Sequence, residues 1–313
     1  MKEILIVRLG AMGDIIHSLP GAVSLRRSFP AARLTWVIDP RFIPLLEGNG
    51  VVDRFVPFHR RQPATWWQTR AELRAMRFDL AVDFQGLIKS ALIGWLSGSK
   101  RLVGFAEENI REKPAGWFYS SRVASNAAHV VEQALDLASG AGAVPVREFP
   151  LAPGRAEGRL PDKPFVLASP LAGWTSKQWP LEHYARLANM VRDRLGMPLV
   201  MNGAPGTVPH VAGALTHESG IAGLIDATRR AALVVGVDSG PLHLAAALGK
   251  AGAAIFGPTD PRRNGPYGGD FAVLRREGVA TTHRRGTEID PAMRAITPEQ
   301  VFTALEARVG CHA

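Results

Sequence analysis

The chain has 313 residues, and its 46% hydrophobic and 21% charged residues are typical of a globular protein, not of a disordered or fibrous one. Its one cysteine, Cys311, excludes an internal disulfide framework and a thiolate metal cluster. The formal net charge is +9, and residues 54–122 alone hold 12 basic and 6 acidic residues. That excess indicates either a solvated basic face or a surface for an anionic partner.

Length and hydropathy suggest a two-domain cytoplasmic protein. At about 150 residues per domain, a chain of this length holds two domains. The most apolar stretch, Leu87–Leu96, is interrupted by Lys89 and is far shorter than the about 18 residues that cross a membrane. The charged residues Lys2, Glu3 and Arg8 surround a short apolar run, which is not the pattern of a signal peptide.

The first half of the chain alternates short apolar runs with helical patterns. The runs are apolar on both faces, which is typical of a parallel sheet covered by helices on both sides. We expect strands over Glu3–Leu9, Arg33–Ile38, Arg54–Pro57, Leu80–Phe84 and Leu102–Phe105. Helices are expected after the run Gly10–Asp14 through Leu25 and over Thr65–Met76, Leu87–Leu96 and His129–Ala141.

A proline-rich stretch follows, after which the same alternation starts again. We expect an N-terminal domain over 1–145, a linker over 146–163, a C-terminal domain over 164–296 and a final helix in 297–313 with Thr297 as its N-cap. Ligands of such sheets bind at the carboxyl ends of the strands, so a cleft between the halves is the expected site. The second half is predicted to hold strands at Phe165–Ser169, Pro198–Asn202, Ala231–Val237 and Ala251–Phe256, and helices at Pro180–Leu195, Gly240–Leu248 and Thr297–Val309.

The first motif is the turn Gly10–Asp14, between the first strand and its helix. Two glycines there let a ligand approach the backbone, and the helix N-terminus favours an anion. The spacing lacks the third glycine of a nicotinamide-binding turn, although Asp39 ends the second strand where a ribose-binding acid would lie. Asp14 is either an N-cap or a general base in the cleft, whose pKa burial would raise towards working pH.

Three further motifs lie in the second half. Lys177, in the loop that follows the strand ending at Ser169, is either a surface lysine or a point charge for phosphate. An apolar strand ends at Asp238, where Ser239 and Gly240 offer backbone N–H groups to a phosphate and His243 lies in the first helical turn. The fourth motif, Phe256–Gly268, is either a turn-rich loop or the far wall of the same pocket.

Together these runs resemble the heptosyltransferase family of bacterial lipopolysaccharide core synthesis. The resemblance rests on MGDIIHSLP, Lys177-x-Trp179-Pro180, VDSGPLHLAAA and FGPTDP, and covers nearly the whole chain. The heptosyltransferase I branch is the most similar, through Phe84–Ala91, Arg60-Arg61 and Ile110–Pro114. The resemblance implies the α/β GT-B fold, in which two Rossmann-like, doubly wound parallel-sheet domains face each other across a cleft.

The activity that the resemblance implies is inverting transfer of L-glycero-D-manno-heptose from ADP-heptose to a Kdo residue of Kdo-lipid A. Asp14 would be the catalytic base. The enzyme would be a monomer at the cytoplasmic face of the inner membrane, with no nucleic-acid partner, metal or cofactor. The donor residues would be Ser169, Lys177, Asp238, Ser239, Gly240, His243, Thr259 and Asp260, and the acceptor residues Gly13, His17, Arg60, Arg61, Gln85, Lys89, Arg111 and Lys113.

Two stretches depart from the family pattern near the expected donor base. The loop Gly203–Thr207 lacks an acid soon after its glycine, and Gly220–Ala227 is short. The alternatives are therefore a related transferase that uses another nucleotide sugar, or a GT-B-type sugar nucleotide epimerase, which would need more carboxylates. A nucleic-acid binder would interleave exposed aromatic residues with the basic ones, whereas Trp66, Trp67 and Trp95 have the helical spacing of packed residues.

Overall fold

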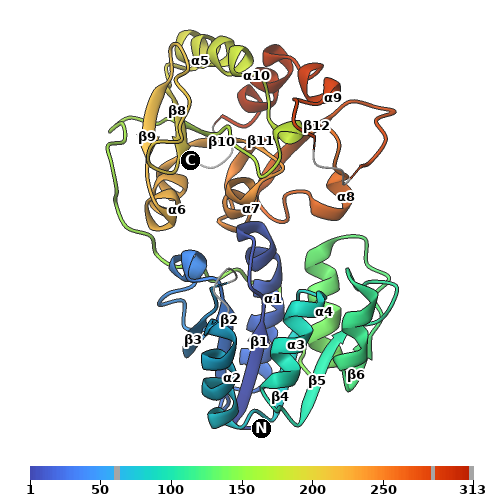
Figure 1. Ribbon diagram of the computed structural model, residues 1–313. Helices are drawn as coiled ribbons and strands as arrows, with labels where there is room; N and C mark the ends of the chain where they lie inside the picture. Colours follow the sequence, from blue (N-terminus) through green and yellow to red (C-terminus); the bar gives the residue numbers. More distant parts are fainter. Residues whose placement is uncertain (60–63, 283–285, 310–313) are drawn as a thin grey trace. The chain divides into compact units, whose positions relative to one another are not determined.

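The computed structural model describes residues 1–59, 64–282 and 286–309, and the chain divides into two compact units, Met1–Ala152 and Pro153–Ala313. Figure 1 shows that each unit is a parallel sheet with helices packed on it. The division after Ala152 lies in the proline-rich stretch. Among the described residues, no helix is both long and apolar enough to cross a membrane.

The N-terminal sheet has the strand order β3-β2-β1-β4-β5-β6, and every pairing is parallel. Val7 of β1 pairs with Val37 of β2 on one side and with Asp83 of β4 on the other. The connections therefore reverse direction between β1 and β4, which is where ligands of such sheets bind. The strands are β1 Glu3–Val7, β2 Arg33–Ile38, β3 Arg54–Pro57, β4 Leu80–Asp83, β5 Arg101–Phe105 and β6 Ser121–Val123.

Helices cover both faces of this sheet. Helix α1 joins β1 to β2, and α3 joins β4 to β5, so the two connections run in opposite directions along the sheet. Because such connections are right-handed, α1 and α3 lie on opposite faces. One face is covered by α1, which packs against α4. On the other, Leu73 of α2 and Ile93 of α3 pack with Leu5 and Val7. The helices are α1 Met12–Ser28, α2 Ala64–Met76, α3 Ile88–Leu96 and α4 Val130–Gly140, with the 3-10 helices η1 Pro40–Leu45 and η2 Lys113–Phe118.

The C-terminal sheet repeats this topology. Its order is β12-β11-β10-β7-β8-β9, all parallel, so β7 and β10 take the places of β1 and β4. The reversal point of this sheet lies between β7 and β10. The strands are β7 Val166–Ser169, β8 Leu199–Gly203, β9 Leu215–Glu218, β10 Leu233–Val237, β11 Ala251–Phe256 and β12 Asp270–Arg275.

Two large apolar clusters make up much of the C-terminal core. One contains Trp179, Tyr184 and Phe302 of the α5 and α10 side, and the other contains Phe165 and Ala245 of the α6 and α7 side. The indole N–H of buried Trp179 donates to the carbonyl of Ile296 at 2.9 Å, so this tryptophan packs in the core. The helices are α5 Leu181–Leu195, α6 Ile221–Arg230, α7 Gly240–Ala247, α8 Pro261–Asn264, α9 Pro291–Arg294 and α10 Pro298–Glu306, with η3 Thr175–Lys177.

The α/β fold with two doubly wound parallel sheets is confirmed, and the N-cap at Thr297 is confirmed by its hydrogen bond from the Gln300 N–H. The final helix, however, ends at Glu306 and not at Val309. The sequence also missed strands β6, β9 and β12 and helix α6. The three strands are short or lie at sheet edges with partly exposed residues, so they lack the continuous apolar run that marks the central strands.

Candidate active site

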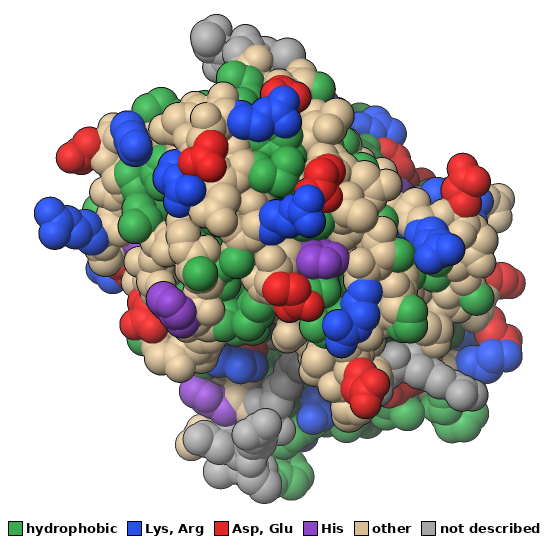
Figure 2. All heavy atoms as spheres, turned by 90° about the horizontal axis from the view of Figure 1, so that it is seen from above, with side chains coloured by type: hydrophobic (Ala, Val, Ile, Leu, Met, Phe, Trp, Pro, Cys, Tyr) green, Lys and Arg blue, Asp and Glu red, His purple; other side chains and the backbone are tan. Residues whose placement is uncertain are grey.

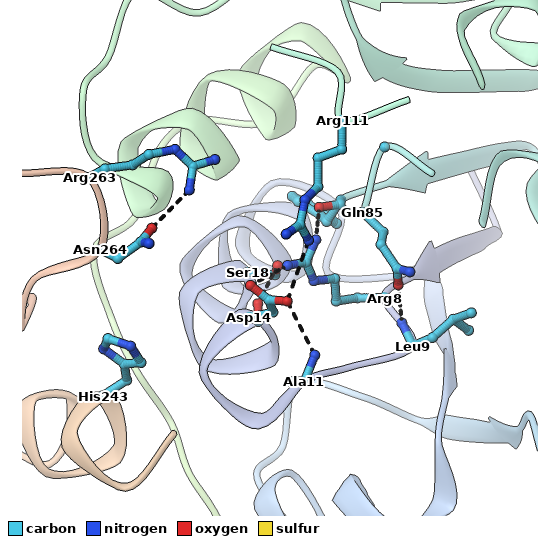
Figure 3. Close-up of polar contacts among 12 residues, drawn as sticks. Arg8, Leu9, Ala11, Asp14, Ser18, Gln85, Arg111, His243, Arg263 and Asn264 are labelled. Atoms are coloured by element: carbon cyan, nitrogen blue, oxygen red, sulfur yellow. Dashed lines mark hydrogen bonds and ion pairs between the residues drawn. The ribbon is translucent and has the colours of Figure 1, made fainter. Parts of the chain in front are cut away.

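The β1–α1 turn places Asp14 at the carboxyl end of the N-terminal sheet. Gly10 has φ +144°, a conformation that favours glycine, and the helix begins after Ala11. Alanine has no side chain that can cap a helix. The Asp14 carboxylate, at the third helical position, instead accepts a hydrogen bond from the N–H of the cap residue Ala11 at 3.2 Å (Figure 3). Asp14 is therefore inside the helix, and it is not the N-cap residue.

Two arginines face the Asp14 carboxylate. Nη2 of Arg8 lies 2.8 Å from Oδ1, and Nη1 of Arg111 lies 3.8 Å from Oδ2 (Figure 3). The Arg8 side chain is 8% exposed and that of Asp14 36% exposed, so the expectation of a buried Asp14 is wrong. Burial lowers the pKa of Arg8, and the charge of Asp14 opposes that effect. The charges of both arginines therefore lie next to the carboxylate.

The turn after β4 holds Arg8 in place. Arg8 Nη1 donates to the carbonyl of Phe84, and the Leu9 N–H donates to Oε1 of Gln85 at 2.8 Å. The adjacent strands β1 and β4 are thereby joined at their carboxyl ends. Gln85, predicted to bind acceptor, uses its carboxamide oxygen to fix the backbone that leads into the Asp14 turn.

The buried carboxylate of Asp83, the last residue of β4, fixes the turn that follows this strand. It accepts hydrogen bonds from the Gln85 N–H at 2.8 Å, from Ser90 Oγ at 2.8 Å and from the Tyr119 hydroxyl at 2.7 Å. Burial raises the pKa of Asp83, and these hydrogen bonds oppose the rise. Asp83 and Arg8 were missed as site residues. Their positions at the ends of neighbouring central strands could have identified both.

The remaining predicted acceptor residues lie around this turn. Gly13 and His17 are buried in α1, and the His17 ring meets the His129 ring edge-on with centroids 5.7 Å apart. Lys89 is in the first turn of α3. Lys113, at the start of η2, forms an exposed ion pair with Glu107 at 2.8 Å, and the hydrogen bond raises its pKa. Arg60 and Arg61 lie outside the described residues.

In the C-terminal unit, Asp238, Lys177 and His243 form one compact cluster. Asp238 directly follows β10, and its Oδ2 lies 2.6 Å from Lys177 Nζ while its Oδ1 lies 3.4 Å from His243 Nε2. Burial opposes ionisation of Asp238, but His243 and Lys177 outweigh it and hold the pKa of Asp238 well below its usual range. Lys177 also lies over the Trp174 ring, 4.3 Å from its centroid.

Two hydroxyl groups and a helix N-terminus accompany this cluster. Ser239 precedes the first residue of α7, Gly240, yet its side chain does not cap the helix. The Ser239 and Thr259 hydroxyls are buried without a hydrogen-bond partner among the described residues. Buried polar groups are normally paired, so these hydroxyls and the first N–H groups of α7 are suited to an anionic, oxygen-rich ligand.

Comparison with known proteins identifies the family. The model of glycosyltransferase family 9 (heptosyltransferase) matches residues 66–291. The chain belongs to this family. Lipopolysaccharide heptosyltransferase 1 of Pseudomonas aeruginosa is 28% identical over 289 residues, covering 85% of this chain and 81% of the relative. The enzyme of the same name from Escherichia coli K12 is 27% identical over 304 residues, covering 87% and 93%.

Solved structures give the same fold. The E. coli heptosyltransferase WaaC with ADP has a TM-score of 0.78 at 23% identity, covering 98% of this chain and 99% of that one. E. coli ADP-heptose lps heptosyltransferase II has a TM-score of 0.80 at 21% identity over the whole of both chains. The expected family and GT-B fold are therefore confirmed. The protein is a glycosyltransferase, and it belongs to the lipopolysaccharide heptosyltransferase family.

Two other predicted donor residues of this family 9 transferase have local structural partners. Ser169, buried at the end of β7, lines a small, mostly apolar cavity with Pro241 and Leu242. Asp260 caps α8, since its carboxylate accepts from the Arg262 N–H at 2.9 Å, and its bonds to Arg262 lower its pKa. Neither geometry requires a ligand.

The loop Gly203–Thr207 has no acid of its own, but the carboxylate of Glu218 from the neighbouring strand lies against it. The N–H of Gly206 donates to Oε1 of Glu218, at the end of β9, at 2.9 Å. In the stretch that seemed short, Gly220 is the N-cap of α6 and Ile221–Ala227 belong to the helix. The Gly220 N–H donates to Oε2 of Glu157 at 2.7 Å, which fixes the start of the helix. In the described part of the chain, no group of three or more His, Cys, Asp or Glu could hold a metal ion.

Proposed function

We propose that this transferase moves L-glycero-D-manno-heptose from ADP-heptose to a Kdo hydroxyl of Kdo-lipid A, with inversion at the anomeric carbon. The observation that carries the proposal is the Lys177–Asp238–His243 cluster beside the N-terminus of α7, because it combines fixed positive charge with unpaired hydroxyls. Support also comes from relatives named lipopolysaccharide heptosyltransferase 1 and from the WaaC structure, whose title names ADP.

In the donor site, Lys177, His243 and the N–H groups of Ser239 and Gly240 bind the diphosphate, together with the Thr259 hydroxyl. Asp238 orients Lys177 and His243 and accepts hydrogen bonds from the heptose hydroxyls. As the glycosidic bond to ADP breaks, negative charge grows on the diphosphate, and these preorganised donors stabilise it. Ser169 and Asp260 complete the proposed donor residues.

In the acceptor site, the Asp14 carboxylate takes the proton of the attacking Kdo hydroxyl while that oxygen bonds to the anomeric carbon from the face opposite ADP. Its ion pair with Arg8 keeps it oriented. Arg111, Lys89 and Lys113 attract the carboxylates and phosphates of the acceptor. Gly13, His17 and Gln85 shape the turn around Asp14, and Arg60 and Arg61 remain proposed contacts. The enzyme acts as a monomer at the cytoplasmic face of the inner membrane, without nucleic acid.

The direct test is incubation of the protein with ADP-heptose and Kdo-lipid A, followed by mass spectrometry of the lipid. We expect a mass gain of one heptose, which Asp14→Asn should slow by about 10²–10⁴-fold. Transfer from another nucleotide sugar but not from ADP-heptose would reassign the donor. Conversion of the sugar nucleotide without any change in the lipid would instead identify an epimerase.

A further inference from the structure

Three exposed tryptophans of the N-terminal unit lie on elements that pack together. Trp67, Trp95 and Trp117 are 73%, 56% and 81% exposed, and they come from α2, α3 and η2. The prediction that Trp67 and Trp95 pack in the interior is therefore wrong, whereas Trp66 does pack, against Phe58. We call Trp67, Trp95 and Trp117 the tryptophan face.

The three elements of this face are packed against one another. The Trp95 ring meets the ring of Phe118, next to Trp117, with centroids 6.0 Å apart. The Arg74 side chain of α2 donates to the carbonyl of Leu96, at the end of α3. Leu73, Ala91 and Ala115 of the same elements form the core beneath. This core does not include the exposed indoles, so packing of the fold does not explain why tryptophan stands at these positions.

The C-terminal unit provides a contrast. Its outer helices α5 and α10 carry charges of both signs joined in ion pairs, such as Arg186 with Glu299 and Arg194 with Glu306. Figure 2 shows this side of the unit, where blue and red side chains are interspersed and the green ones form small separate patches. Among its described residues, no exposed large hydrophobic residue is aromatic. Exposed indoles are therefore a property of one surface and not of the whole chain.

Basic residues outnumber acidic ones on the three elements of the tryptophan face, although Lys113 is paired with Glu107. Helices α2, α3 and η2 hold four basic residues, Arg70, Arg74, Lys89 and Lys113, and one acidic residue, Glu72. Indole rings prefer the headgroup region of a bilayer, and long basic side chains reach from there to lipid phosphates. Tryptophan and arginine are also enriched at protein–protein interfaces. The excess of four cations over one acid on these elements is what favours an anionic membrane over a second protein.

We propose that the tryptophan face docks on an anionic bilayer, with its indoles among the headgroups and its cations on lipid phosphates. This inference rests on the proposed lipid-anchored acceptor. Lys89 and Lys113 begin α3 and η2 at the edge of the sheet where Arg111 meets Asp14. A bilayer on this face therefore lies beside the edge at which the acceptor reacts.

The test is cosedimentation of the full chain with two kinds of vesicle, one of equal parts phosphatidylcholine and phosphatidylglycerol and one of phosphatidylcholine alone. We expect binding to the anionic vesicles, weakened by salt. Replacement of Trp67, Trp95 and Trp117 by serine should reduce the affinity on the order of tenfold or more. The matched control removes exposed apolar side chains from the C-terminal unit, with Leu181→Ser, Leu215→Ser and Val273→Thr, and should bind as the parent does.

Two outcomes overturn the proposal: unchanged vesicle binding by the triple tryptophan variant, or a parent dimer that this variant dissociates in light scattering. A transfer assay separates this proposal from the proposed function. With a soluble acceptor that lacks acyl chains, the tryptophan variant should keep the parent's turnover, and with vesicle-embedded acceptor its apparent KM should rise. If the parent transfers heptose to neither acceptor, the proposed function fails while the vesicle-binding result stands by itself.

Discussion

The two units have the same topology but differ in the exposure of the acid at the point where the strand order reverses. At the β1/β4 reversal the acid, Asp14, is partly exposed, its nearer partner Arg8 is buried and its second partner Arg111 is exposed. At the β7/β10 reversal the acid, Asp238, is itself buried, at 6% exposure, and the groups around it are the cation Lys177 and the imidazole of His243. An accessible carboxylate suits proton removal, whereas a buried carboxylate that orients donors suits an anion. The fold fixes where each site lies, and the residue placed there decides its chemistry.

The largest effect should come from neutralising the accessible acid. Asp14→Asn keeps the hydrogen-bonding shape of the turn but cannot accept the acceptor's proton. We expect turnover to fall by about 10²–10⁴-fold, the usual loss for a general base, with ADP affinity retained. Steady-state kinetics and calorimetry measure the two quantities. Near-parental turnover at neutral pH would remove Asp14 from the role of base.

The corresponding change in the other unit should affect the donor first. Lys177→Ala removes a largely buried charge from the cluster and leaves Asp238 paired only with His243. Charge-assisted hydrogen bonds contribute roughly 1.5–3 kcal/mol, so ADP affinity should fall by about 10–100-fold, and transfer should slow as well. Lys163→Ala, in the segment before β7, is the matched control and should leave both unchanged. Unchanged ADP affinity and turnover in Lys177→Ala would assign Lys177 to the surface.

Arg8 tests whether its charge matters to Asp14, beyond its packing. Arg8→Gln removes the guanidinium 2.8 Å from the carboxylate, and protonation of Asp14 then becomes easier. The acid limb of the kcat/KM profile should therefore shift to higher pH by about 1 unit. Arg8→Lys keeps a charge and should restore much of the parental profile. If both variants lose activity equally at every pH, Arg8 has only a packing role.

The pKa of Asp238 predicts how the donor cluster responds to acid. Because its pKa in the folded protein lies below the ordinary value, the unfolded chain binds the proton more readily. The cluster's contribution to stability is therefore present at neutral pH and is lost as the pH falls below about 4. Urea unfolding from pH 7 down to the acid range should show the parent losing about 1–2 kcal/mol more than Asp238→Asn. Parallel pH profiles would contradict this assignment.

Sequence patterns predicted the polar turns better than the contacts between strands that are far apart along the chain. Lys177, Asp238 and His243 follow the carboxyl ends of strands in one sheet, and the order of strands and helices was enough to bring them together. Arg8, however, depends on β1 lying beside β4, a neighbour 76 residues away along the chain. The exposed tryptophans were misjudged because helical spacing identifies a common face but not whether that face is inside. Burial depends on the sheet beneath, which local pattern does not report.

The smallest effect, and the sharpest test of which unit holds which substrate, should come from exposed cations beside Asp14. Arg111 is 52% exposed and Lys113 75% exposed, so each contact with the acceptor is screened. Replacing both with alanine should raise the apparent acceptor KM only severalfold, since exposed ion pairs contribute about 0.2–1 kcal/mol each. The effect should shrink with added salt, and ADP affinity should stay unchanged. Lys100→Ala with Arg101→Ala removes the same charge at the other end of the sheet, where β5 begins, and should change neither substrate's constant. If the double variant of Arg111 and Lys113 binds ADP more weakly instead, the cations of the N-terminal unit bind the donor. The assignment of acceptor to the N-terminal unit and donor to the C-terminal unit is then wrong.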